Sequence, residues 1–186
     1  MDKIKMQLER FIPFNEQETV DLKIILDWVN SGQDILTRDN QVAHITTSAW
    51  VVNKARTHVL MAYHNIYETW AWLGGHADGN DNLLQVACNE AHEESGIETL
   101  YPVQEEIFSL EILCVEGHVK RGEYVSSHLH LNFTYLLEAD MDQKLIINEE
   151  ENSDVAWIKL EDVKNRSKES WFVERIYSKL IDKMHA

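Results

Sequence analysis

The segment from Gly74 to Ile97 constrains the fold most, because a glycine-rich loop leads directly into an amphipathic helix. The pattern predicts a helix over about residues 83–95 that Gly96 ends. On a helical wheel, the small and apolar side chains share one arc, which we expect to be buried: Leu83, Leu84, Ala87 and Ala91. The opposite, solvent-facing arc consists of Gln85, Asn89 and His92. Such a helix must pack one face on a neighbouring layer.

Three glutamates stand at the margin of this arc. Glu90 and Glu94 fall beside the apolar residues, and Glu93 falls just outside them. Like charges at i and i+4 destabilise a helix, and no Lys or Arg occurs from residue 57 to residue 119 to pair with them. Carboxylates that converge without a cation raise one another's pKa values, and a divalent ion with oxygen ligands relieves the repulsion. A solvated acidic helix face is the alternative interpretation.

The flanking segments predict an α/β fold, with a mixed β-sheet and helices packed on it. Expected strands are residues 43–52, 59–64, 70–72, 107–115, 127–137 and 155–158. Expected helices are residues 17–30, which Asn15 would cap, and 171–184, with a helical turn at 160–163. Residues 74–79 are expected to form a loop. We divide the chain into an N-terminal helical extension, residues 1–40, and a main domain, residues 41–186.

Charge and composition exclude several classes of protein. Seventeen basic and 32 acidic residues give a net charge of −15, which repels nucleic acid and anionic membranes. No apolar run approaches the roughly 20 residues that cross a bilayer, and the N-terminus is too polar for a secretory signal, so we expect a cytoplasmic protein. Cys88 and Cys114 have no CxxC spacing and are expected to be reduced, packed thiols.

The same segment resembles the Nudix box, Gly-x5-Glu-x7-Arg-Glu-U-x-Glu-Glu-x-Gly-U, in which U is a bulky aliphatic residue. The matching positions are Gly75, Glu90, Glu93, Glu94, Gly96 and Ile97, and Ala91 matches loosely. The preceding Gly-Gly-His-Ala-Asp-Gly sequence resembles one branch of bacterial Nudix proteins. The resemblance implies a Nudix-type α/β/α sandwich and a pyrophosphohydrolase that cleaves a diphosphate bond in a nucleoside-diphosphate-linked or related small molecule.

The resemblance also implies a site. Mg²⁺ or Mn²⁺ would be held by Glu90, Glu93 and Glu94, with the backbone carbonyl of Gly75 as a further ligand, and Glu93 and Glu94 would be catalytic. Two box positions differ, since Asp81 stands where the family has Glu and Asn89 where it has Arg. In the family these two are thought to brace the loop against the helix. Here a weaker carboxylate-to-amide hydrogen bond would replace the ion pair.

The general base is less constrained by the sequence. Glu151 precedes the expected strand at residues 155–158, and in many Nudix proteins a Glu just ahead of a similar strand reaches the metal site. We therefore assign the base to Glu151, with Glu105 and Glu106 as alternatives. A charged surface turn is the other interpretation of the segment around Glu151.

Substrate contacts have several candidates. His128 and His130 share one face of an expected strand and would touch phosphate or base if that face looks into the site. They are alternatively ordinary polar residues on an open sheet face, or a zinc pair for which the sequence shows no third ligand. Trp70 and Trp72 would stack on a nucleobase or pack in the core. His76 is expected to help hold the loop rather than to catalyse.

Two rival functions use the same fold. A non-catalytic Nudix-like sensor of a nucleotide metabolite usually lacks a box glutamate, whereas all three are present here. An isopentenyl-diphosphate isomerase would place its catalytic cysteine near Gly74, and neither Cys88 nor Cys114 is in that register. The N-terminal helix also offers a surface that is compatible with a homodimer.

Overall fold

A computed structural model describes residues 1–66, 68–120 and 122–186. The helices are α1 (Asp2–Arg10), α2 (Glu16–Asn30), α3 (Leu83–Ser95), η1 (Leu160–Asp162), α4 (Val163–Arg166), α5 (Ser170–Phe172), the π-helical turn η2 (Val173–Tyr177) and α6 (Ser178–His185). The strands are β1 (Ala43–Asn53), β2 (His58–His64), β3 (Thr69–Ala71), β4 (Leu73–His76), β5 (Tyr101–Pro102), β6 (Ser109–Val115), β7 (His118–Lys120), β8 (Glu123–Val125), β9 (His128–Ala139) and β10 (Asn152–Lys159).

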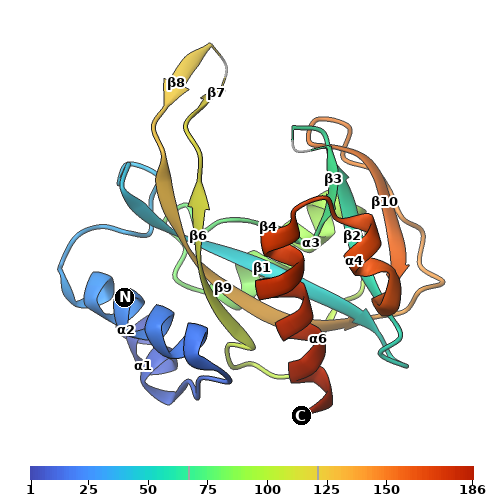
Figure 1. The fold of residues 1–186 in the computed structure, drawn as a ribbon, viewed down its shortest axis with the longest axis horizontal. Helices are drawn as coiled ribbons and strands as arrows, with labels where there is room; N and C mark the ends of the chain where they lie inside the picture. Colours follow the sequence, from blue (N-terminus) through green and yellow to red (C-terminus); the bar gives the residue numbers. More distant parts are fainter. Residues whose placement is uncertain (67, 121) are drawn as a thin grey trace.

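Strand β1 is the centre of a mixed sheet. It runs parallel to β9, with His44 opposite His130, and antiparallel to β2 and β4. The sheet order is β10-β2-β1-β9-β5, while β3 pairs with β2, β4 with β1 and β6 with β9. Strands β7 and β8 form a separate hairpin that projects beyond the body of the molecule (Figure 1).

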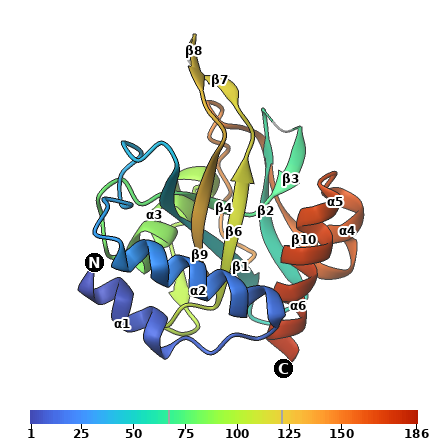
Figure 2. The same cartoon turned by 60° about the vertical axis from the view of Figure 1, so that its left-hand side comes forward.

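Helices cover both faces of this sheet, which confirms the predicted fold class. In Figure 1, α6 crosses in front of the sheet and α3 lies behind it. The α3 side buries Ile45, Leu131, Leu83 and Ala87 in one core, and the α6 side buries Trp50 in a second core. Helix α2 packs on β6, crossing in front of β6 and β9 in Figure 2, and α1 packs on α2. The two helices contribute Ile4, Leu8 and Ile25 to the core on the α3 side.

The predicted helix boundaries of α2 and α3 are confirmed at their caps. The Asn15 side chain accepts a hydrogen bond from the Glu18 N–H at 2.9 Å, which satisfies one of the free amides at the start of α2. Gly96 ends α3 with a φ of +70°, in the left-handed region that favours glycine. Among the described residues, no helix is both long and apolar enough to cross a membrane.

Two expectations are wrong, and one element was not predicted. Gly74 and Gly75 belong to strand β4, which pairs with β1, rather than to a loop. A methyl group at Gly74 would overlap the Thr47 carbonyl, so only glycine permits this close approach of the two strands. The β7–β8 hairpin was not expected. Both cysteines are free, but only Cys88 is partly buried, whereas Cys114 is exposed because it lies near the end of the edge strand β6.

Candidate metal centre

Helix α3 places the three glutamates at different depths, and Glu93 is the outermost, as the helical wheel predicted. Glu94 is buried, with 6% of its surface exposed. Glu90 is half-buried and Glu93 is exposed. The helix packs its apolar arc against β1 and β4, so the two deeper carboxylates lie at the edge of the core.

Strand β4 fixes these two carboxylates. The backbone N–H of Gly74 donates to Oε2 of Glu94 at 2.8 Å. The Glu90 carboxylate lies so close to Gly75 that a β-carbon there would overlap it. Strand pairing with β1 holds β4 in place, so the sheet itself positions the backbone of Gly75 beside Glu90. The structure thus brings Gly75, Glu90 and Glu94 together.

The site is electrostatically strained in the absence of a cation. Burial raises the pKa of Glu94 to about 8, and the charges of Glu90 and Glu151 add to this, against the opposing Gly74 hydrogen bond. Burial also raises the pKa of Glu90 to about 7, together with the charges of Glu93, Glu151 and Asp78. Carboxylates that lie close together repel one another, and a hard divalent ion with oxygen ligands is the kind of ion that such a cluster can bind.

Glu151 is the carboxylate from outside α3 that acts on both deeper glutamates. It immediately precedes β10 and is exposed, and its backbone carbonyl accepts a hydrogen bond from Asn65 N–H at 3.0 Å. The other candidate bases, Glu105 and Glu106, are exposed in the segment between β5 and β6. The Glu151 carboxylate therefore lies within electrostatic reach of the cluster from the β10 side.

The loop after β4 is braced by a residue that the sequence did not single out. Arg38 donates from Nε and Nη2 to the two carboxylate oxygens of Asp78, at 2.8 and 2.6 Å. Its charge also lowers the pKa of Glu90, against the other effects. The search for a basic partner covered residues 57–119, which contain no Lys or Arg, and so it did not reach Arg38. The sequence feature that could have indicated this partner is an arginine in the segment that leads into β1.

The two altered box positions have other partners. Asn89 accepts a hydrogen bond from Gln85 Nε2 at 2.8 Å within α3. Asp81 lies 3.5 Å from the N-terminal amine of Met1. The hydrogen bonds of the described residues include none between Asp81 and Asn89, so in this structure Arg38 and Asp78 make the bracing contact.

The histidines and tryptophans lie elsewhere. Side chains alternate along β9, so His128 and His130 lie on the face opposite Leu131 and α3. Trp70 is only 8% exposed and packs edge-to-face on Tyr63. Trp72 is partly buried beside Tyr177 of the C-terminal helical segment. The structure therefore does not group these residues with the carboxylates.

Comparison with known proteins shows the family. The model of the NUDIX domain matches residues 42–180. A MutT protein from Methanosarcina mazei Go1 is 14% identical, with a TM-score of 0.60 over 79% of this chain and 99% of that one. A C. elegans Ap4A hydrolase binary complex is 18% identical, with a TM-score of 0.54 over 76% and 94%. A NUDIX-family hydrolase from Clostridium perfringens is 22% identical, with a TM-score of 0.52 over 76% and 97%.

A search of curated proteins finds no match to the chain. The identities to the three structures are low, so those likenesses establish the fold alone. Nudix hydrolases generally use divalent metals and act on small molecules, which agrees with the carboxylate cluster of α3. With its family match over most of the sequence, its mixed sheet and its glutamate-bearing helix, the chain belongs to the Nudix family of hydrolases.

Proposed function

We propose that the chain is a Mg²⁺- or Mn²⁺-dependent pyrophosphohydrolase that cleaves a diphosphate bond in a nucleoside-diphosphate-linked or related small molecule. The observation that carries this proposal is the convergence of Glu90 and Glu94 beside the backbone of β4. Their pKa values are raised to about 7 and about 8 by burial and by the neighbouring carboxylates. The fold therefore holds negative charges close together, and a bound cation would relieve their repulsion.

The residues of the cluster have separate tasks. Glu90, Glu93, Glu94 and the Gly75 carbonyl would hold the ion. A bound divalent ion neutralises diphosphate oxygens and lowers the pKa of the attacking water. The Gly74 N–H fixes the rotamer of Glu94. Arg38 holds the loop through Asp78.

Glu151 would act as the general base. Its carboxylate takes a proton from water, the water oxygen bonds to phosphorus, and the anhydride P–O bond breaks, leaving two phosphate products. Its exposed position, just ahead of β10, is open to solvent and to a substrate phosphate. Neither of the alternative bases, Glu105 and Glu106, is among the main influences on the pKa values of Glu90 and Glu94.

The substrate is identified by a screen. Nucleoside triphosphates, dinucleoside polyphosphates, ADP-ribose and nucleotide sugars are incubated with the protein and millimolar Mg²⁺, and phosphate or nucleotide release is measured. Structures of this fold include an Ap4A hydrolase and a dihydroneopterin triphosphate pyrophosphohydrolase, so dinucleoside and pteridine polyphosphates belong in the set.

We expect release from at least one class, loss of release in excess chelator, and recovery on adding Mg²⁺ or Mn²⁺. The matched control is Glu98→Gln, which removes an exposed carboxylate just beyond α3 and should retain turnover. Full turnover in excess chelator would refute the metal requirement. Tight binding of a nucleotide without cleavage would favour the sensor function instead.

A further inference from the structure

Four histidines gather on the face of the sheet that is turned away from α3. His44 comes from β1, His76 from β4, and His128 and His130 from β9. Strand pairing brings them together, since His44 is opposite His130, and His76 is opposite Thr46, two residues along β1. Neighbouring residues of β4 thus face different sites, with Gly75 beside Glu90 and His76 among the histidines.

Three of the rings form a nearly regular triangle. The ring centroids of His44 and His76 are 5.2 Å apart, and those of His44 and His130, and of His76 and His130, are each 5.0 Å apart. One ring nitrogen from each of the three lies within 4.8 Å of the others. Tetrahedral Zn²⁺ with Zn–N bonds of about 2.0–2.1 Å holds its nitrogen ligands about 3.3 Å apart, so modest ring rotations would close this triangle on an ion.

Backbone carbonyls already select the ligating nitrogens. Nδ1 of His44 lies 3.0 Å from the Asn40 carbonyl, and a carbonyl only accepts, so Nδ1 carries the proton and Nε2 keeps its lone pair. This Nε2 is buried, on a residue only 4% exposed, and has no hydrogen-bond partner among the described residues. A buried polar atom without a partner destabilises the folded protein, and a bond to a metal ion would relieve this cost.

His128 orients His130 in the same manner. Nδ1 of His128 donates to the Ser126 carbonyl at 2.9 Å, so its Nε2 is an acceptor. That Nε2 lies 3.2 Å from Nε2 of His130, which therefore donates and leaves its own Nδ1 with a lone pair. Such outer hydrogen bonds commonly fix the tautomer of metal-ligating histidines.

We propose that His44, His76 and His130 form a transition-metal site, with Zn²⁺ as the fitting ion, separate from the carboxylate centre on α3. The ligand set is neutral imidazole, which suits Zn²⁺ and other first-row transition ions rather than Mg²⁺. Three protein ligands leave a fourth tetrahedral position for water or another small ligand. The proposal does not depend on the proposed pyrophosphohydrolase activity.

The test measures Zn²⁺ binding with the carboxylate centre saturated. Protein freed of metal by chelator is dialysed into chelator-free buffer with millimolar Mg²⁺ and titrated with Zn²⁺ by calorimetry. We expect about one equivalent of tightly bound Zn²⁺ that Mg²⁺ does not displace, and visible absorption bands when Co²⁺ replaces Zn²⁺.

Variants assign the ligands. His44→Ala and His130→Ala should each weaken Zn²⁺ binding about 100-fold or more. His185→Ala, at the exposed C-terminal end, and Glu94→Gln, in the carboxylate centre, should both retain it. Melting curves without metal identify any variant that fails to fold, and His44→Gln then replaces it. Absence of Zn²⁺ binding under Mg²⁺, retention in both histidine variants, or loss in Glu94→Gln would each overturn the proposal.

Discussion

The glutamates of the carboxylate cluster on α3 are buried to different extents, and burial has the largest effect on the pKa values of Glu90 and Glu94. Glu94 is almost fully buried and Glu93 is exposed, although both match glutamates of the Nudix box pattern. Burial rather than sequence position raises the pKa of Glu94 to about 8. The buried carboxylate is therefore the residue whose replacement reports most directly on a bound cation.

Glu94→Gln should change the pH dependence of stability. The pKa of Glu94 is about 8 in the folded, metal-free protein and near 4.5 when unfolded, so between these values the folded state binds more protons. The stability of the metal-free parent should therefore fall as pH rises from about 5 to 8.5. The variant should flatten this slope and be more stable by about 1 kcal/mol at the upper end.

The same variant should respond less to Mg²⁺. An ion that binds only the folded state raises stability by mass action, so the parent should gain melting temperature in millimolar Mg²⁺ and the variant should gain less. Melting curves at several pH values, with Mg²⁺ or with chelator, measure both effects. Identical pH slopes and equal Mg²⁺ shifts in the two proteins would remove Glu94 from the site.

Glu151→Gln should lower turnover about tenfold or more and leave the KM within a few fold. A general base acts mainly in the transition state, so its loss affects kcat more than substrate binding. The matched control is Glu150→Gln, which alters the adjacent exposed carboxylate. If Glu151→Gln retains the parental kcat, the base is elsewhere and Glu105 and Glu106 are tested next.

At the scale of elements, the loop between β4 and α3 is held from outside the segment that carries the box. Arg38 donates hydrogen bonds to both carboxylate oxygens of Asp78, and the Gly79 N–H donates to the Leu36 carbonyl at 2.9 Å. Asp78 has a φ of +45°, which is uncommon for a residue other than glycine. The bidentate ion pair therefore holds a turn that the loop sequence does not favour by itself.

Arg38→Gln should impair the proposed metal centre more than the fold. Both side chains of the pair are about half exposed, at 50% and 49%, so the effect on the free energy of unfolding should be at most about 1 kcal/mol. Loss of the brace and of its positive charge should change the Mg²⁺ concentration needed for half-maximal turnover several-fold and lower kcat.

A double-mutant cycle with Asp78→Asn checks this prediction. If the two residues act as one brace, the double variant should be no worse than the more damaging single variant. Arg10→Gln, at the exposed end of α1, is the control for loss of an arginine charge. Additive losses in the cycle would show that Arg38 acts independently of Asp78.

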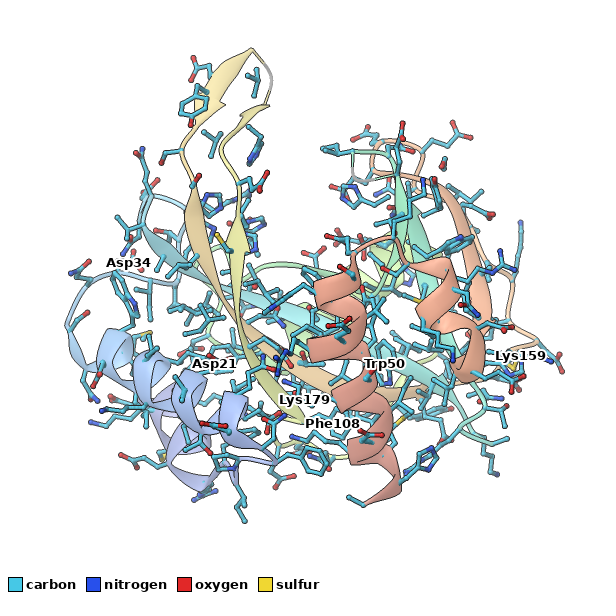
Figure 3. The ribbon with its side chains drawn as sticks, viewed as in Figure 1. Asp21, Asp34, Trp50, Phe108, Lys159 and Lys179 are labelled. Atoms are coloured by element: carbon cyan, nitrogen blue, oxygen red, sulfur yellow. The ribbon has the colours of Figure 1, made fainter. Side chains whose placement is uncertain are left out.

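At the scale of the whole molecule, a buried ion network joins the N-terminal helices to the C-terminal helix. Glu18 of α2 is fully buried and accepts hydrogen bonds from Lys183 and, at 2.6 Å, from Ser109 Oγ. Lys179 of α6, labelled in Figure 3, donates to Glu111 of β6 at 2.9 Å. Although the family match begins at residue 42, the helices before it thus share buried contacts with it.

Glu18→Gln should destabilise the protein by about 3 kcal/mol, because it leaves the Lys183 ammonium group without its carboxylate and removes one of the two carboxylates beside the buried Lys179. Burial raises the pKa of Glu18, but the hydrogen bonds from Ser109 and Lys183 outweigh it, so the pKa is lowered. This contribution is therefore present above about pH 4.5 and is lost as pH falls through the folded pKa.

Urea unfolding of parent and variant at neutral pH measures the change. Asp27→Asn, on an exposed position of the same helix, should alter the free energy of unfolding by less than about 0.5 kcal/mol. A Glu18→Gln loss no larger than that of Asp27→Asn would mean that the network does not couple the extension to the main domain.

The sequence alone determined the local features. The α3 periodicity, Gly96 as its end and Asn15 as the cap of α2 follow from 3.6-residue spacing and backbone geometry. The same periodicity predicted that Glu93 lies farther from the core than Glu90 and Glu94. These properties depend on residues that are only a few positions apart, so they can be predicted from the sequence of a single chain.

Only the tertiary structure decided which distant residues meet. Strand pairing places His44 and His76 beside His130, although the sequence showed no third ligand for the His128–His130 pair. Arg38 reaches Asp78 across 40 positions, and Lys179 and Lys183 reach Glu18 across more than 160. Such contacts depend on sheet order and register, which arise from the packing of the whole chain and leave no fixed spacing in the sequence.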